Sequence, residues 1–112
     1  MKGKIVLIQF PFDNLSSSKV RPAYCLTKAI GSYQHIIFAL ITSRIPSIPL
    51  TTDILLQPQH ADFSLSGLQK PSTLRLDHLI TLRRSMIRRE LGYLSPITQS
   101  EISHLLCQWL SR

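Results

Sequence analysis

Apolar residues occur in short runs along the chain, and turn residues end each run, which is the pattern of β-strands. The first run, Ile5–Phe10, is stopped by Pro11. Two further runs, Ala23–Lys28 and His35–Thr42, lie on either side of Gly31. We expect these two runs to pair as an antiparallel hairpin.

The middle of the chain predicts a loop followed by two shorter strands. Pro46 and Pro49 lack a backbone donor, so the segment that contains them cannot lie inside a sheet. Asp53–Leu56 is expected to return as a short strand, and Ser72–Asp77 alternates polar and apolar residues as a half-buried strand does.

The alternation in the last of these strands separates two kinds of side chain. A period of two places Arg75 and Asp77 on one face, and Leu74 and Leu76 on the other. The two charged groups are therefore expected to lie together. On the same rule His78 points away from them, which favours a structural role for this histidine.

A helix is predicted at the end of the chain. Ser95 is a good N-cap and Pro96 suits the first helical position. A one-sided apolar stripe follows at Ile102, Leu105, Leu106 and Trp109. Trp109 is expected to anchor this amphipathic helix in the core. The predicted class is mainly β (α+β), a small barrel with one C-terminal helix docked on it.

Length and charge narrow the class of protein. The chain has 112 residues, which is enough for one domain over residues 1–112, and 44% of them are hydrophobic. Lys and Arg number 13 against six Asp and Glu, a formal net charge of +7. A surface with this charge attracts polyanions.

Several kinds of chemistry lack the residues they need. Cys25 and Cys107 stand alone in apolar runs, where small thiols are usually buried, and the four histidines are scattered. We therefore expect neither a metal nor another cofactor. The four glycines are isolated, so a phosphate-binding loop and a nucleophile elbow are absent from the sequence. No apolar stretch is long enough for a membrane helix, and we expect a cytoplasmic protein.

Four blocks of sequence form a recognisable pattern: KGKIVLIQFPFDNLSSSKVRP at 2–22, ALITSR at 39–44, GLQKPSTLRLDHLITL at 67–82 and LGYLSP at 91–96. Together they resemble the MazF/PemK family of toxin endoribonucleases. Their order and spacing cover essentially the whole chain. One position departs from the family pattern, because Lys4 follows Gly3 where the family usually has Asp.

The resemblance implies a fold, a partner and an activity. The fold is a compact SH3-like barrel that forms a homodimer. The activity is that of the toxin of a type II toxin–antitoxin system, a metal-independent and sequence-preferring endoribonuclease (an mRNA interferase). In this reaction the ribose 2′-hydroxyl of single-stranded RNA attacks the adjacent phosphorus and expels the 5′-oxygen. An acidic antitoxin is the expected protein partner, since it would compete with RNA for a basic groove.

The resemblance also implies roles for individual residues. Arg21 matches the catalytic arginine, which stabilises the negative charge of the transition state and protonates the leaving group. Thr42 matches a hydroxyl residue that binds the scissile phosphate, and Arg75 and Asp77 match an acid–base pair. We predict a substrate-binding set of neighbouring hydroxyl and cationic side chains, namely Ser18, Lys19, Ser43, Arg44 and Lys70.

Other interpretations remain open at this stage. Arg21 can be a surface residue beside a turn proline, Thr42 an ordinary strand residue, and Arg75 with Asp77 a surface ion pair. The cluster Arg83, Arg84, Arg88 and Arg89 fits a solvated face as well as an RNA track. Two other functions also fit the chain: a related barrel toxin that inhibits DNA gyrase, and a basic RNA-binding module without turnover.

Overall fold

The computed structural model describes residues 1–9 and 19–112. Within them the chain forms six strands in one sheet, ordered β4-β5-β3-β2-β1-β6, and every neighbouring pair of strands is antiparallel. The elements are β1 (Lys4–Gln9), β2 (Val20–Cys25), β3 (His35–Thr42), β4 (Asp53–Leu56), α1 (Phe63–Ser66), β5 (Ser72–Arg83), a 3-10 turn (Arg84–Met86), β6 (Ile87–Tyr93) and α2 (Pro96–Leu110).

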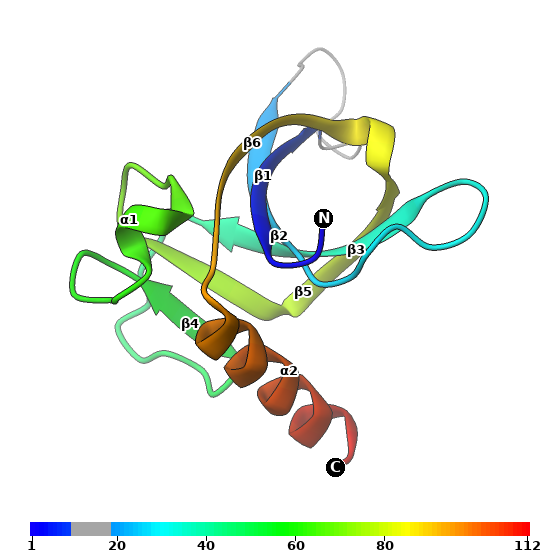
Figure 1. The fold of residues 1–112 in the computed structure, drawn as a ribbon. Coiled ribbons are helices and arrows are strands. Elements are labelled where there is room, and N and C mark those ends of the chain that lie inside the picture. The colour runs from blue at the N-terminus through cyan, green and yellow to red at the C-terminus, as the bar shows by residue number, and fades with distance from the viewer. Residues whose placement is uncertain (10–18) are drawn as a thin grey trace.

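The sheet is strongly curled, and α2 lies across its outer side (Figure 1). The predicted fold class, mainly β with a C-terminal helix, is confirmed. The sheet is not closed, because β4 and β6 stand at its two ends and the described residues show no pairing between them. The predicted barrel is therefore an open one.

The hairpin of β2 and β3 forms as predicted, with different limits for its first strand. β2 begins at Val20 and ends at Cys25, and Ala23 pairs with Leu40. The predicted Ile5–Phe10 strand is seen as β1, and its last predicted residue lies outside the described residues. The structure adds α1 and β6, and it extends the predicted Ser72–Asp77 strand to Arg83.

Alternation along the strands divides the core into two layers. In β1, Ile5 packs into the layer that also holds Ile102 of α2, whereas Val6 packs into a second layer with Phe38. These four side chains are all buried. Because neighbouring strand residues point to opposite faces, the sheet carries one layer under the helix and another inside its curl.

Two predictions about buried residues are wrong. Trp109 is 45% exposed instead of anchored in the core. The stripe is used only in part, because Ile102 is buried and Leu105 and Leu106 are partly buried against the core, whereas Trp109 lies near the free end of the helix. Cys25 is buried as expected, but Cys107 is exposed. Burial raises the pKa of the Cys25 thiol to about 11.

Asp62 ties the start of α2 to the rest of the molecule. Ser95 is the N-cap, and its Oγ accepts from the backbone N–H of Thr98. The backbone N–H and the hydroxyl of Ser95 each donate to Asp62 Oδ2 at 2.9 Å. Burial opposes the charge of Asp62, but the hydrogen bonds from Ser95 and Thr98 outweigh it and lower the pKa of this carboxyl. The helix is thereby fixed at its N-terminus.

Candidate functional site

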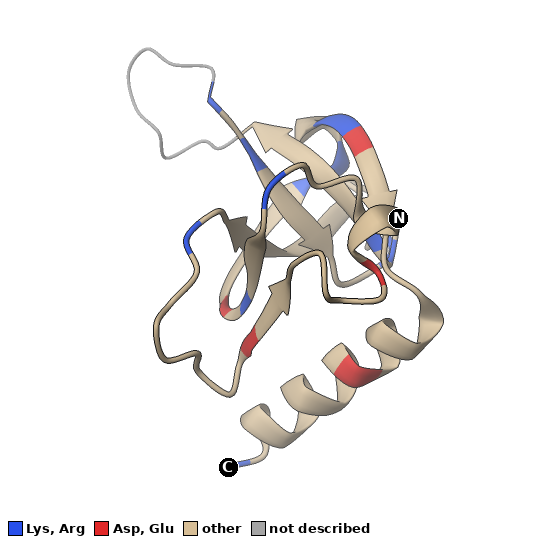
Figure 2. Cartoon of the chain, turned by 90° about the vertical axis from the view of Figure 1, so that its left-hand side faces the viewer, with Lys and Arg blue, Asp and Glu red and all other residues tan. Residues whose placement is uncertain are grey.

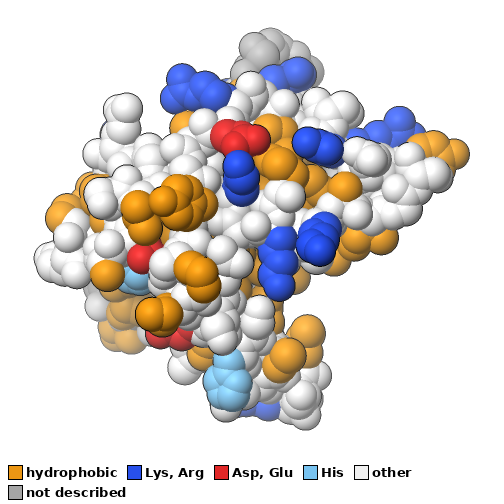
Figure 3. All heavy atoms as spheres, viewed as in Figure 1, with side chains coloured by type: hydrophobic (Ala, Val, Ile, Leu, Met, Phe, Trp, Pro, Cys, Tyr) orange, Lys and Arg blue, Asp and Glu red, His pale blue; other side chains and the backbone are white. Residues whose placement is uncertain are grey.

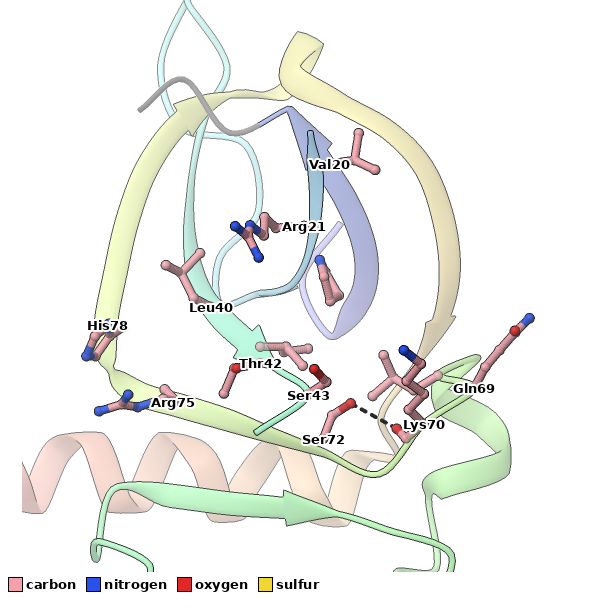
Figure 4. A pocket seen from close by; sticks show the side chains of 13 residues that line it. Val20, Arg21, Leu40, Thr42, Ser43, Gln69, Lys70, Ser72, Arg75 and His78 are labelled. Carbon is pink, nitrogen blue, oxygen red and sulfur yellow. Dashed lines mark hydrogen bonds between the residues drawn. The ribbon is translucent and has the colours of Figure 1, made fainter. Parts of the chain in front are cut away.

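A cavity of about 480 Å³ opens where β2, β3 and β5 meet the segment before β5 (Figure 4). Its walls include apolar side chains such as Val20, Leu40 and Leu68 beside several cationic and hydroxyl groups. The polar residues that line it are Arg21, Thr42, Ser43, Gln69, Lys70, Ser72, Arg75 and His78. This mixture can hold a phosphate group and an adjoining apolar ring together.

Three of the four predicted catalytic residues line this one cavity. Arg21 comes from β2, Thr42 from the end of β3 and Arg75 from β5. The order of the strands explains this, because β3 lies between β2 and β5 in the sheet. Asp77, the fourth residue, is not part of the lining but contacts Arg75.

The five predicted substrate-binding residues do not all lie in the same place. Ser43 and Lys70 line the same cavity. Lys19 is exposed just before β2 and does not line it, and Ser18 lies outside the described residues. Arg44 lines a second cavity of about 340 Å³, which shares Thr42 and Arg75 with the first. Thr42 and Arg75 thus lie between the two cavities and line both of them.

Two carboxylates hold the Arg75 side chain. Its Nη2 donates to Asp77 Oδ2 at 3.3 Å, and its Nε lies 3.8 Å from Asp53 Oδ1. The Asp53 side chain is 4% exposed, and the register of the sheet places Asp53 directly opposite Arg75. Sequence reasoning treated Asp53 only as the start of a strand, because a contact across strands is invisible along the chain.

The turn after β3 fixes the Thr42 hydroxyl. Thr42 Oγ1 accepts from the backbone N–H of Arg44 at 3.2 Å. The buried Thr73 hydroxyl donates to the Arg44 carbonyl at 2.8 Å, which holds the turn against β5. The proton of the Thr42 hydroxyl is not used in the bond to Arg44. It is therefore suited to donate to an oxygen in the cavity.

His78 is the residue that sequence reasoning placed wrongly. Ala39 pairs with Leu79, but the next residue, Leu40, pairs with Arg75, so β5 has a bulge between these positions. The bulge breaks the period of two, and His78 lines the cavity instead of pointing away from it. Figure 4 shows His78 and Arg75 close together at the bend in β5. A bulge of this kind leaves no clear mark in a single sequence.

Charge is distributed unevenly over the molecule. Within α2, Glu101 is the charged residue and no Lys or Arg occurs, whereas Lys and Arg are frequent in and beside the strands (Figure 2). Most of the basic side chains visible in Figure 3 lie over the curled sheet. The cavity therefore opens on the more basic part of the surface, where a polyanion is attracted.

Lys4, the departure from the family pattern, lies in a surface ion pair. Its Nζ is 2.8 Å from Glu90 Oε1 on the neighbouring strand β6. The hydrogen bond and the positive charge of Lys4 lower the pKa of the Glu90 carboxyl. Lys4 is not among the residues that line the cavity.

Among the described residues, no three His, Cys, Asp or Glu side chains lie close enough to hold a metal ion. In the same part of the chain, no helix has both the length and the apolar character needed to cross a membrane.

Fold and cavity together define a small protein with an open antiparallel sheet, a docked C-terminal helix and a basic pocket between strands. Comparison with known proteins assigns its family. The model for "PemK-like, MazF-like toxin of type II toxin-antitoxin system" matches residues 1–110. The chain belongs to this family of toxins.

Solved structures share the fold at low sequence identity. The Mycobacterium tuberculosis toxin MazF-mt6 has a TM-score of 0.71 and 20% identity, with 96% of each chain covered. A structure described as an Mtb toxin has a TM-score of 0.67 and 19% identity, covering 94% of this chain and 98% of its own. An endoribonuclease in complex with its cognate antitoxin, from a mycobacterial species, has a TM-score of 0.69 and 15% identity, covering 99% and 94%. No curated protein sequence matches the chain.

Proposed function

We propose that this toxin is a metal-independent endoribonuclease that cleaves single-stranded RNA in the cytoplasm by attack of a ribose 2′-hydroxyl on the adjacent phosphodiester. The observation that carries the proposal is the meeting of Arg21, Thr42 and Arg75 in one cavity. These residues are distant in sequence, and the family resemblance implies a catalytic role for each.

The chemistry needs little more than this pocket supplies. The nucleophile belongs to the RNA itself, so the protein has to position the backbone, move protons and stabilise negative charge. The planar guanidinium groups of Arg21 and Arg75 suit the oxygens of a phosphate, and the Thr42 hydroxyl adds a neutral donor. Asp77 holds Arg75 in place and is the predicted acid–base partner.

Ser43 and Lys70 extend the binding surface along the same cavity. Lys70 contributes positive charge, which favours the RNA backbone whatever its sequence. Arg44 contributes to the second cavity, which begins on the other side of Thr42 and Arg75. We assign a preference for short RNA sequences to side chains around these two hollows, where bases next to the cleaved bond would lie.

An antitoxin and a second copy of the chain are the proposed protein partners. The family consists of toxins from toxin–antitoxin pairs, and one structural neighbour was solved with its cognate antitoxin. An acidic antitoxin segment would be attracted to a chain of net charge +7 and would compete with RNA for the cavity.

The test compares two RNA oligonucleotides in the presence of a chelator. One is all-ribose, and the other carries a single 2′-deoxy sugar at the cut site. We expect the wild-type protein to cut only the first, and Arg21→Ala to cut it roughly 10²-fold more slowly. Arg112→Ala, which removes the exposed arginine after α2, is the matched control and should cut at the wild-type rate. Equal cutting of the two oligonucleotides, or an intact all-ribose RNA, contradicts the proposal.

A further inference from the structure

His78 lies in the same cavity as the residues to which the proposed reaction is assigned. The β5 bulge brings its side chain to the lining shared with Arg21, Thr42 and Arg75. The side chain is 49% exposed, so it is open to a ligand that enters the cavity. Imidazole is the side chain whose ordinary charge change falls between about pH 5 and 8.

One carboxylate oxygen connects His78 to Arg75. Asp77 Oδ2 accepts from Arg75 Nη2 at 3.3 Å and lies 3.9 Å from His78 Nε2. The second distance is too long for a hydrogen bond, so the contact between Asp77 and His78 is electrostatic. Asp77 therefore lies beside both the arginine and the histidine of this wall, where it can position them.

We propose that His78 is the general base of the cleavage reaction, with Asp77 as its positioning residue; this assignment rests on the proposed function. The neutral imidazole takes the proton of the 2′-hydroxyl while the bond from O2′ to phosphorus forms. The bond from phosphorus to O5′ breaks, and O5′ takes a proton from Arg21, which regains it from solvent. The imidazolium then returns its proton to solvent, so the catalyst is restored and protons balance.

A histidine suits this task better than Asp77 does. An ordinary aspartate has a pKa near 3.9, so it is a weak proton acceptor at neutral pH. Asp77 is also engaged with a permanent cation, because Arg75 keeps its charge at any physiological pH. His78 lines the cavity, whereas Asp77 does not.

Several charged groups lie beside His78 or line the same cavity. Arg75 and Asp77 come from its own strand, whereas Arg21 of β2 and Lys70 of the segment before β5 line the cavity farther from it (Figure 4). β3 contributes Leu40 and Thr42 at this wall, neither of which titrates in this range. A phosphate in the cavity adds negative charge. A pH profile of the cleavage rate therefore reports on this set of groups together.

The experiment uses the full chain and measures single-turnover cleavage of one RNA oligonucleotide between about pH 5 and 8. We expect the wild-type rate to rise with pH, and His78→Gln to cut roughly 10²-fold more slowly and to lose that rise. The binding of the 2′-deoxy oligonucleotide should remain at the wild-type level. His104→Gln, at an exposed position of α2, is the matched control and should behave as the wild type.

A second variant separates chemistry from structure. His78→Ala leaves space in the wall of an open cavity, and added imidazole should restore part of its cleavage rate. Restoration supports the assignment even if the glutamine variant folds poorly. A His78→Gln rate within about threefold of wild type with the same pH profile, or an absence of restoration, overturns it. If the wild type cuts RNA and His78→Gln cuts equally well, only this inference fails; if the wild type cuts no RNA, the proposed function fails with it.

Discussion

Asp53 Oδ1 and Arg75 Nε face each other across the β4–β5 pair at 3.8 Å, and both atoms are buried without a hydrogen bond. The other Asp53 oxygen accepts from the backbone N–H of Leu50 at 2.9 Å. Asp53 therefore connects the loop before β4 to the arginine of the cavity. Asp53 also lines the second cavity with Arg75, so its buried carboxylate partly neutralises the arginine from that side.

Replacement of Asp53 is expected to destabilise the protein. Asp53→Asn removes the charge that faces Arg75 and weakens the bond to Leu50, so we expect a loss of about 1–2 kcal/mol in the free energy of unfolding. Urea denaturation measures it. Asp77→Asn is the matched control, because its ion pair with Arg75 is more exposed, and its expected effect is within about 0.5 kcal/mol. Equal losses of unfolding free energy in both variants would contradict the prediction that the buried carboxylate of Asp53 stabilises the fold more than the exposed one of Asp77.

Asp62 predicts a dependence of stability on pH. Its pKa is lowered in the folded protein, so its contribution is complete above the unfolded value near 3.8 and is lost as pH falls through the folded pKa. Asp62→Asn should therefore cost about 1–3 kcal/mol at pH 7. The difference from wild type should shrink below about pH 4. Thermal melts across this pH range measure it.

The control for this prediction is Glu101→Gln, an exposed carboxylate of α2, which should change stability by less than about 0.5 kcal/mol. A gap between wild type and Asp62→Asn that stays constant down to acid pH would mean that the charge of Asp62 does not stabilise the start of α2.

Lys70 predicts a salt dependence of RNA binding. If its ammonium group meets a phosphate, Lys70→Ala weakens binding to all sequences alike and reduces the slope of log affinity against log salt by about 1. Lys28→Ala, which removes an exposed lysine between β2 and β3, should leave the slope unchanged. Fluorescence anisotropy with an uncleavable 2′-deoxy oligonucleotide measures both variants. A slope unchanged by Lys70→Ala would remove this residue from the binding surface.

Short-range sequence patterns were sufficient to predict most of the strands and the C-terminal helix. The alternation at Leu74 and Leu76 correctly predicted two buried side chains, and Ser95 is the N-cap that its position before Pro96 indicated. These properties depend on neighbours within a few residues. The family resemblance selected Arg21, Thr42 and Arg75, and the structure brings these three together; their catalytic roles stay predictions.

Only the tertiary structure decided what surrounds those three residues. Asp53 reaches Arg75 through the register of two strands, and His78 enters the cavity through a bulge set by the pairing of β3 with β5. Trp109 is exposed because α2 packs on the core only as far as Leu106, and Trp109 lies beyond that point. The chain by itself determines the period of its hydrophobic residues, the capping residues and the net charge. Contacts between distant strands depend on register, and register is a property of the folded sheet.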